Sequence, residues 1–171
     1  LLLDDATKMV GCYKALAKIG MVEKPGISRE PMRQALAFCQ NIKLSQTFAS
    51  EFGNVIKEYT SNEEVEEEFK TDLEVQLHHV DGTFNADQRN EKLSWLSEDI
   101  DKNICRVLTN ARCLSEGVDV PALDAIMFLH PRKSQIDVVQ SVGRVMRKAE
   151  GKDLGYVIIP IAVAPGISPE K

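Results

Sequence analysis

Short, almost continuously apolar segments constrain the fold of this chain more than any other feature. A strand that is buried on both faces of a sheet has such a run, because both of its sides meet other apolar groups. The expected strands of this kind are residues 34–39, 104–108, 125–129 and 155–159. A further segment, 73–78, alternates apolar with polar residues, which is the period of a half-exposed strand. The chain therefore predicts a sheet whose inner strands are covered on both sides.

Helical patterns fill the intervals between these strands. Apolar residues at helical spacing mark residues 4–19, with Gly20 as the expected C-cap. Asn41 is expected to cap a helix through about residue 57, and Asn85 with Gln88 forms a capping-box pattern for another. The acidic run Glu63–Glu68 predicts a short amphipathic helix. Strands that alternate with helices, without hairpin signals, predict an α/β fold: three layers, α-β-α, around a mainly parallel sheet.

The chain of 171 residues, 43% of them hydrophobic, suits one domain with an adequate core. We expect a single domain over residues 1–171, in which 1–33 form an N-terminal helix and a linker. No apolar run approaches the roughly 20 residues of a membrane helix, and the sequence shows no signal-peptide pattern, so a cytoplasmic location is expected. Because the chain starts without Met and directly in a helical pattern, we expect it to be a piece of a longer protein.

The formal net charge of −5 argues against a domain that holds nucleic acid by bulk electrostatics, which needs clustered Lys and Arg. Any such contact is expected to be local or shared with another domain. The four cysteines form no CxxC pair, and Cys39 and Cys105 lie in apolar segments, which predicts reduced core thiols. His78 and His79 have no partner ligands at zinc spacing, so no metal site is predicted.

The segment Ser134–Lys148 carries the strongest candidate chemistry. On a helix with about 100° per residue, Gln140, Arg144 and Arg147 share one face, and three valines lie opposite. Two guanidinium groups one turn apart suit the oxygens of a polyphosphate, and Gly143 beside them would allow close approach. From the residues alone, a solvated basic helix face is an equal alternative.

A turn with two carboxylates precedes this helix. Gly117 lies between Glu116 and Asp119, after the expected strand 104–108. Such a turn at the carboxyl edge of a parallel sheet lies where the ligands of these sheets bind. Taken alone, the four residues fit an ordinary surface turn better.

Together these segments resemble the motifs of superfamily-2 (DEAD/DEAH-type) helicases. SQIDVVQSVGRVMRK resembles motif VI, with its Q-x-x-G-R-x-x-R core, and VLTNARCLSEGVDVPALDAIMFLHP resembles motif V. QALAFCQNIKLSQTFASEF resembles motif IV, and HVDGTFNADQRNEKLSWL resembles the family's H-x-x-G block. The match covers most of residues 34–160. With the opening LDDATKMVGCYKALAK, it is nearest in character to bacterial restriction-modification-type helicases.

The resemblance implies the fold and a nucleotide site that two domains share. The chain would be the second, C-terminal RecA-like domain of a helicase. Arg144 and Arg147 would be arginine fingers to the ATP γ-phosphate, and Gln140 an auxiliary contact. Gly117, Asp119 and Gly143 would lie near the nucleotide, with Asp119 close to its ribose or to the metal–water shell.

The resemblance also implies contacts to nucleic acid, with DNA as the expected track. The residues implied are Thr109, Arg112, Asn41, Lys43, Ser45, Gly82 and Thr83. For those at the start of the expected helix, an ordinary cap with solvated neighbours is an equal alternative. His79 is expected to form hydrogen bonds within the fold. Trp95 fits either packing or base stacking.

Two motifs of a complete motor are missing from this sequence. It contains no G-x-x-x-x-G-K-[ST] phosphate loop and no D-E-x-[HD] motif, which would hold ATP and Mg²⁺. ATP and Mg²⁺ would therefore be shared with an N-terminal RecA-like domain of the same parent chain, and the isolated chain is expected to be inactive. The alternatives are a non-catalytic α/β interaction or regulatory module that keeps a helicase-like fold, and a nucleotide-binding domain that completes its own site.

Overall fold

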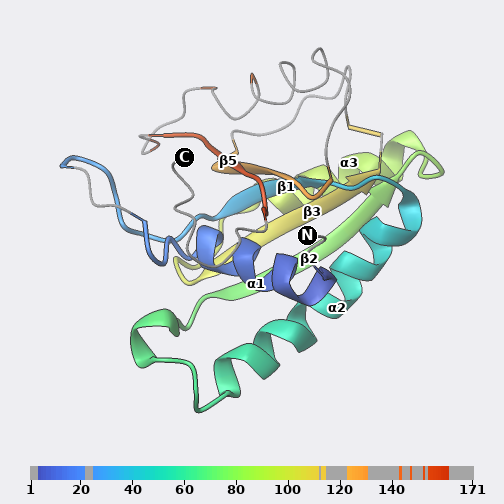
Figure 1. Cartoon of the computed structure of the whole chain (residues 1–171). Helices are drawn as coiled ribbons and strands as arrows, with labels where there is room; N and C mark the ends of the chain where they lie inside the picture. Colours follow the sequence, from blue (N-terminus) through green and yellow to red (C-terminus); the bar gives the residue numbers. More distant parts are fainter. Residues whose placement is uncertain are drawn as a thin grey trace.

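The computed structural model describes residues 4–21, 25–111, 113–114, 123–130, 143, 147, 152 and 154–161. Within these residues the sheet has five strands (Figure 1), in chain order β1 Gln34–Phe38, β2 Glu74–Asp81, β3 Ile104–Ala111, β4 Ala125–Phe128 and β5 Tyr156–Ile158. Their order across the sheet is β2-β3-β1-β4-β5, and every neighbouring pair is parallel. The predicted strands and the parallel sheet are confirmed. No helix in the described part of the chain is long and apolar enough to cross a membrane.

Helices cover both faces of this sheet. α1 (Asp5–Leu16) and α2 (Ile42–Ser61) lie on one face, and α3 (Ala86–Ser97) lies on the other (Figure 1). Each face has its own apolar cluster. The α2 side buries Phe48 and Phe52 against β1 and β3, whereas the α3 side buries Leu93 and Leu96. The expected three-layer arrangement is therefore confirmed.

α1 is an integral part of the core. Its residues Met9, Cys12, Tyr13 and Leu16 are buried, and the Tyr13 hydroxyl donates a hydrogen bond of 3.0 Å to the carbonyl oxygen of Thr71. The helix packs beside α2, and the residues that it buries lie at the helical spacing from which it was predicted. Its end differs from the prediction. The C-cap is Ala17, and Gly20 lies beyond the helix in a turn with φ +74°.

Local capping signals located the helix starts correctly. The Asn41 side chain accepts a hydrogen bond of 2.9 Å from the backbone N–H of Leu44, and both bonds of the Asn85–Gln88 capping box are present. The short helix expected over the acidic run was wrong, because only a 3₁₀ turn, η1 (Glu67–Phe69), forms there. α2 continues to Ser61, and closely spaced carboxylates repel one another when wound into a helix.

None of the four cysteines forms a disulfide bond, and Cys39 and Cys105 are buried, as their apolar segments predicted; Cys12 is buried as well. Burial raises the pKa of Cys12 to about 12, so this thiol stays protonated at neutral pH. The described residues contain no group of three His, Cys, Asp or Glu side chains that could hold a metal ion.

Candidate functional site

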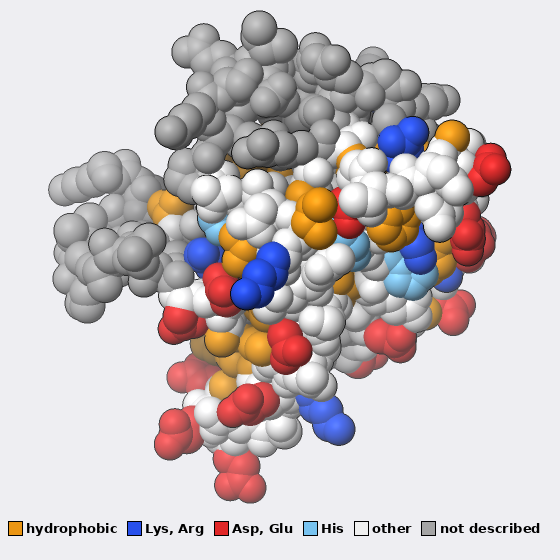
Figure 2. Space-filling view, turned by 90° about the vertical axis from the view of Figure 1, so that its right-hand side faces the viewer, with side chains coloured by type: hydrophobic (Ala, Val, Ile, Leu, Met, Phe, Trp, Pro, Cys, Tyr) orange, Lys and Arg blue, Asp and Glu red, His pale blue; other side chains and the backbone are white. Residues whose placement is uncertain are grey.

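The carboxyl ends of the parallel strands meet at one edge of the sheet, where ligands of such folds bind. Asn41 and Lys43 follow β1 in the first turn of α2, and Gly82 and Thr83 follow β2. All four of these predicted nucleic-acid contacts are exposed. Figure 2 views the molecule from the side where α2 begins. Among the described residues on this side, Lys and Arg are scattered rather than gathered in one patch, as the net charge of −5 suggests.

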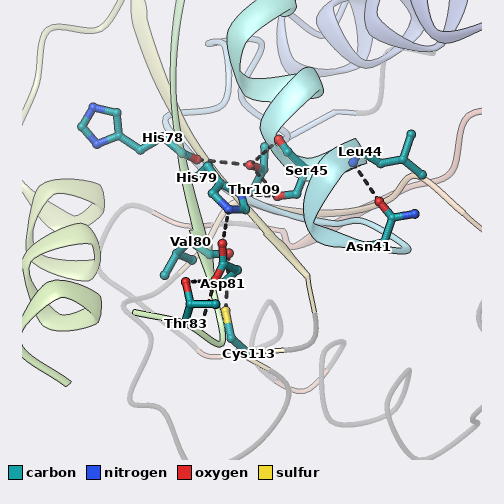
Figure 3. Close-up of polar contacts among 10 residues, drawn as sticks. All are labelled: Asn41, Leu44, Ser45, His78, His79, Val80, Asp81, Thr83, Thr109 and Cys113. Atoms are coloured by element: carbon teal, nitrogen blue, oxygen red, sulfur yellow. Dashed lines mark hydrogen bonds and ion pairs between the residues drawn. The ribbon is translucent and has the colours of Figure 1, made fainter. Parts of the chain in front are cut away.

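A buried chain of hydrogen bonds connects the two exposed segments (Figure 3). The Nδ1 atom of His79, on β2, lies 2.6 Å from the Ser45 hydroxyl of α2. Its Nε2 atom lies 2.7 Å from a carboxylate oxygen of Asp81. The other oxygen of Asp81 accepts bonds from both the backbone N–H and the hydroxyl of Thr83, at 2.7 and 2.6 Å. One imidazole ring thus links α2 to the turn after β2.

Asp81 is the charged member of this network. Burial alone would raise the pKa of its carboxyl group, but the hydrogen bonds from Thr83 and His79 outweigh burial, and the pKa lies below its usual value. The carboxylate is therefore ionised at neutral pH and can only accept hydrogen bonds. It follows that Nε2 of His79 carries a proton and donates to Asp81.

Ser45 and Thr109 lie inside the protein, and this corrects their expected role. Both residues are fully buried, and the Ser45 hydroxyl lies 2.9 Å from that of Thr109. Thr109 also donates toward the main-chain oxygen of Ser45, at 3.1 Å. A residue with no exposed surface cannot touch a phosphate. The expectation of direct nucleic-acid contact from Ser45 and Thr109 is therefore wrong for this structure, and both instead support the residues around them.

The arrangement of Ser45, His79 and Asp81 resembles the triad of a hydrolase in composition only. In that triad the serine must reach a substrate, and the carboxylate holds Nδ1 of the histidine while Nε2 faces the serine. Here the nitrogens are reversed, and Ser45 is fully buried. The geometry excludes a nucleophilic role and leaves a structural one.

Most of the predicted nucleotide-side residues lie outside the described part of the chain: Gln140, Arg144, Gly117 and Asp119, and with them the nucleic-acid candidate Arg112. Gly143 and Arg147 are described, and both are exposed. The main-chain oxygen of Arg147 accepts a hydrogen bond of 3.0 Å from the Lys152 side chain. The arginine-finger assignment stays a prediction.

Sequence reasoning missed Asp81 and Asn110. Asp81 directly precedes the Gly-Thr turn, and an Asp that bonds the backbone two residues ahead is a recognised turn signal that could have identified it. Asn110, at the end of β3, is fully buried, and its amide donates to the carbonyl oxygen of Ala37 at 3.1 Å. Its side-chain oxygen has no hydrogen-bond partner. No sequence signal distinguishes Asn110 from a surface asparagine.

Trp95 lies on the other face of the sheet and packs within the fold. Its ring stacks on His78 with centroids 3.8 Å apart and planes 18° apart, and the Arg106 guanidinium lies 4.9 Å from the ring centre. Of the two alternatives for Trp95, the structure shows packing. Burial, followed by the charges of Lys92 and Arg106, lowers the pKa of His78.

One cavity lies at the opposite edge of the sheet, away from the candidate residues. It has a volume of about 990 Å³ and is lined by the segment before β1 and the start of β5, including Met21, Ile27 and Tyr156. None of the predicted site residues lines it. A small cavity of about 20 Å³ lies at the carboxyl edge, lined by residues that include Leu44, Phe48 and His130.

Comparison with known proteins finds one matching family model and several solved structures of similar fold. A family model described as helicase conserved C-terminal domain matches residues 14–149. The solved structure of LlaBIII, an ATP-dependent Type ISP restriction-modification enzyme bound to DNA, is 38% identical with a TM-score of 0.78. The match covers 99% of this chain and 11% of that one.

Two further relatives extend the comparison. Domain 2 of the DEAD-box helicase Mss116p, bound to an RNA duplex, is 18% identical with a TM-score of 0.55, covering 90% of this chain and 50% of that one. This likeness shows the fold alone. A curated protein of African swine fever virus named as a probable helicase is 39% identical over 57 residues, which are 33% of this chain and 7% of the viral protein. The expected RecA-like fold is confirmed.

Proposed function

Because this chain belongs to the helicase conserved C-terminal domain family, matched over residues 14–149, we propose that it is the C-terminal motor domain of an ATP-dependent helicase or translocase that acts on DNA. The family match carries this proposal. DNA is proposed as the track because the relative that is 38% identical over nearly the whole chain is an enzyme bound to DNA. The chain spans only 11% of that protein and 7% of the viral helicase, so the activity of the whole protein is part of the proposal.

The nucleotide site is proposed to lie between this domain and an N-terminal RecA-like domain of the same protein. The sequence has no phosphate loop, and no cluster of metal-binding side chains occurs among the described residues, so ATP and Mg²⁺ would be held by the other domain. Arg144 and Arg147 would reach the γ-phosphate, with Gln140 beside them. Gly117, Asp119 and Gly143 would line the nucleotide side of the cleft.

The nucleic-acid path is proposed to cross the carboxyl edge of the sheet. Exposed Asn41, Lys43 and Gly82 would contact the phosphate backbone there, together with Arg112. Thr83 is exposed as well, but Asp81 accepts both its N–H and its hydroxyl, so its donors are not directed at a phosphate. Closure of the cleft on ATP and its opening after hydrolysis would move this surface relative to the other domain. This motion would shift the protein along the bound DNA.

The test uses the full-length parent protein with Arg144→Ala and Arg147→Ala. We expect nucleic-acid-stimulated ATP hydrolysis to fall about 10³-fold or more in each variant, because an arginine finger stabilises charge that develops only in the transition state. DNA binding should change little. Lys57→Ala, which removes an exposed positive charge toward the far end of α2, is the matched control and should leave both quantities unchanged.

Unchanged turnover in both arginine variants would remove the finger assignment. A parent protein whose ATP hydrolysis responds to no DNA would refute the motor proposal and favour a non-catalytic interaction module. Stimulation by RNA instead of DNA would keep the motor and correct its track.

A further inference from the structure

Building on the proposed function, we infer that His79 is a positioning residue that fixes the Gly82–Thr83 turn relative to the first turn of α2, so that the two exposed segments meet one nucleic-acid backbone at a constant spacing. Neither His79 nor Asp81 is a contact residue in this inference, because their side chains are only 12% and 3% exposed. Both act through the segments that they join.

Strand register explains how the network forms. His79 and Thr109 are partners across β2 and β3, so their side chains share one face of the sheet. That face is the one covered by α2, and Ser45 is the fourth residue of this helix, two positions after the exposed Lys43. The imidazole therefore lies between the start of α2 and the end of β2, at the carboxyl edge of the sheet (Figure 3).

The link between His79 and Ser45 forms with a neutral or a protonated ring, but the Ser45 hydroxyl has one hydrogen and donates to only one partner at a time. With a neutral ring, Ser45 donates to Nδ1, and Thr109 donates to the main-chain oxygen of Ser45. With a protonated ring, Nδ1 donates to Ser45, whose hydroxyl then turns to donate to Thr109. Only one hydroxyl hydrogen changes direction. The link between α2 and the turn is present in both arrangements.

The turn held by this network is open on its outer side. Asp81 fixes its inner side by accepting both donors of Thr83. Among the described residues, no atom outside Asp81, Gly82 and Thr83 lies within 4 Å of the position that a β-carbon on Gly82 would occupy. A ligand backbone can therefore approach Gly82 closely, while the conformation of the turn depends on Asp81 and, through it, on His79.

The experiment compares His79→Gln with His78→Gln in the full-length parent protein. A glutamine at position 79 cannot bridge Ser45 and Asp81 as the ring does. The DNA concentration that gives half-maximal ATP hydrolysis should rise about 3- to 10-fold, the equivalent of one lost hydrogen-bonded contact, while kcat at saturating DNA stays within about 2-fold. His78→Gln changes the adjacent residue, whose ring lies on the other face, and should alter neither quantity.

Two further variants separate positioning from stability. Tyr13→Phe removes one hydrogen bond, to Thr71, far from this edge, so it should lower the melting temperature without changing the half-saturating DNA concentration. Asp81→Asn preserves shape and can still accept from Thr83, and it should raise that concentration less than His79→Gln does. The Asp81→Asn variant also tests the positioning role if His79→Gln does not fold. In that case, an unchanged half-saturating DNA concentration in Asp81→Asn would overturn the inference.

The outcomes distinguish this inference from the proposal on which it rests. If the wild-type parent shows no DNA-stimulated hydrolysis, the proposed function fails. If the wild type is stimulated but folded His79→Gln has the same half-saturating DNA concentration, or loses kcat instead, the positioning role is refuted and the motor proposal stands.

Discussion

His78 and His79 are neighbours in sequence, yet they belong to opposite faces of the sheet and to different kinds of structure. His79 lies under α2 in a buried network with Ser45 and Asp81. His78 lies on the α3 side, stacked on Trp95 in a partly exposed group. A buried polar side chain costs stability when it lacks a partner, whereas a surface group can exchange its partners for water. The contacts of two adjacent histidines are therefore expected to contribute very differently to the stability of the fold.

The largest expected difference concerns the carboxylate on each face. Asp81→Ala removes the acceptor of two bonds from Thr83 and one from His79, and we expect this chain to lose about 3 kcal/mol of unfolding free energy. Glu98→Ala on the other face removes a largely exposed partner of Arg106 and should cost less than about 1 kcal/mol. Chemical denaturation measures both. Equal losses of unfolding free energy in the two variants would show that the contacts of Asp81 are no more important to stability than the exposed ion pair of Glu98.

A smaller, matched effect is expected at the two helix caps. Asn41→Ala and Asn85→Ala each remove a side chain that accepts from a backbone N–H, and each should cost about 1 kcal/mol. Because capping is local, the cost should be similar for α2 and α3 although the faces differ. A much larger loss in Asn41→Ala would mean that the first turn of α2 is coupled to the buried network more strongly than its cap alone implies.

The smallest expected effect is on the pH dependence of stability. His78 on one face and Asp81 on the other should affect the unfolding free energy in different pH ranges. The pKa of His78 is lowered in the folded state, so the unfolded chain binds the proton more readily, and stability falls as pH drops below about 6.5. The pKa of Asp81 is also lowered, so its contribution is complete above about pH 4 and is lost as pH falls further. Unfolding free energies at pH 7.5, 5.5 and 3.5 should show a smaller first loss in His78→Gln, and the remainder is expected from His130, whose pKa is also lowered by burial. An undiminished loss between pH 7.5 and 5.5 in that variant would assign the loss to groups other than His78.

Local signals predicted much of the fold. Continuous apolar runs marked the inner strands, and Asn41 and Asn85 marked helix starts, because each feature depends on residues close in sequence. The acidic run failed as a helix because its apolar residues were too few to outweigh charge repulsion. No local signal could place the hydroxyl of Ser45 against His79 and Thr109, which are 34 and 64 positions away.

The motifs located the candidate site, but not the direction in which each side chain points. Ser45 shares a helix face with buried Phe48 and Phe52, and Thr109 follows Val107 at the two-residue period of a strand. The helix and strand periodicities both indicated that Ser45 and Thr109 are buried, whereas the motif resemblance implied that they contact nucleic acid. Exposed Lys43 and Gly82 had no such conflict.

The packing of α1 matters to anyone who excises this domain for study. The family match begins at residue 14, inside a helix that runs from Asp5 to Leu16. A recombinant fragment cut at that boundary would lose Met9 and Cys12, which are only 2% and 0% exposed, and would leave the adjoining surface of α2 in contact with water. Such a fragment should express poorly or aggregate, and its failure would reflect the choice of boundary rather than any property of the intact domain.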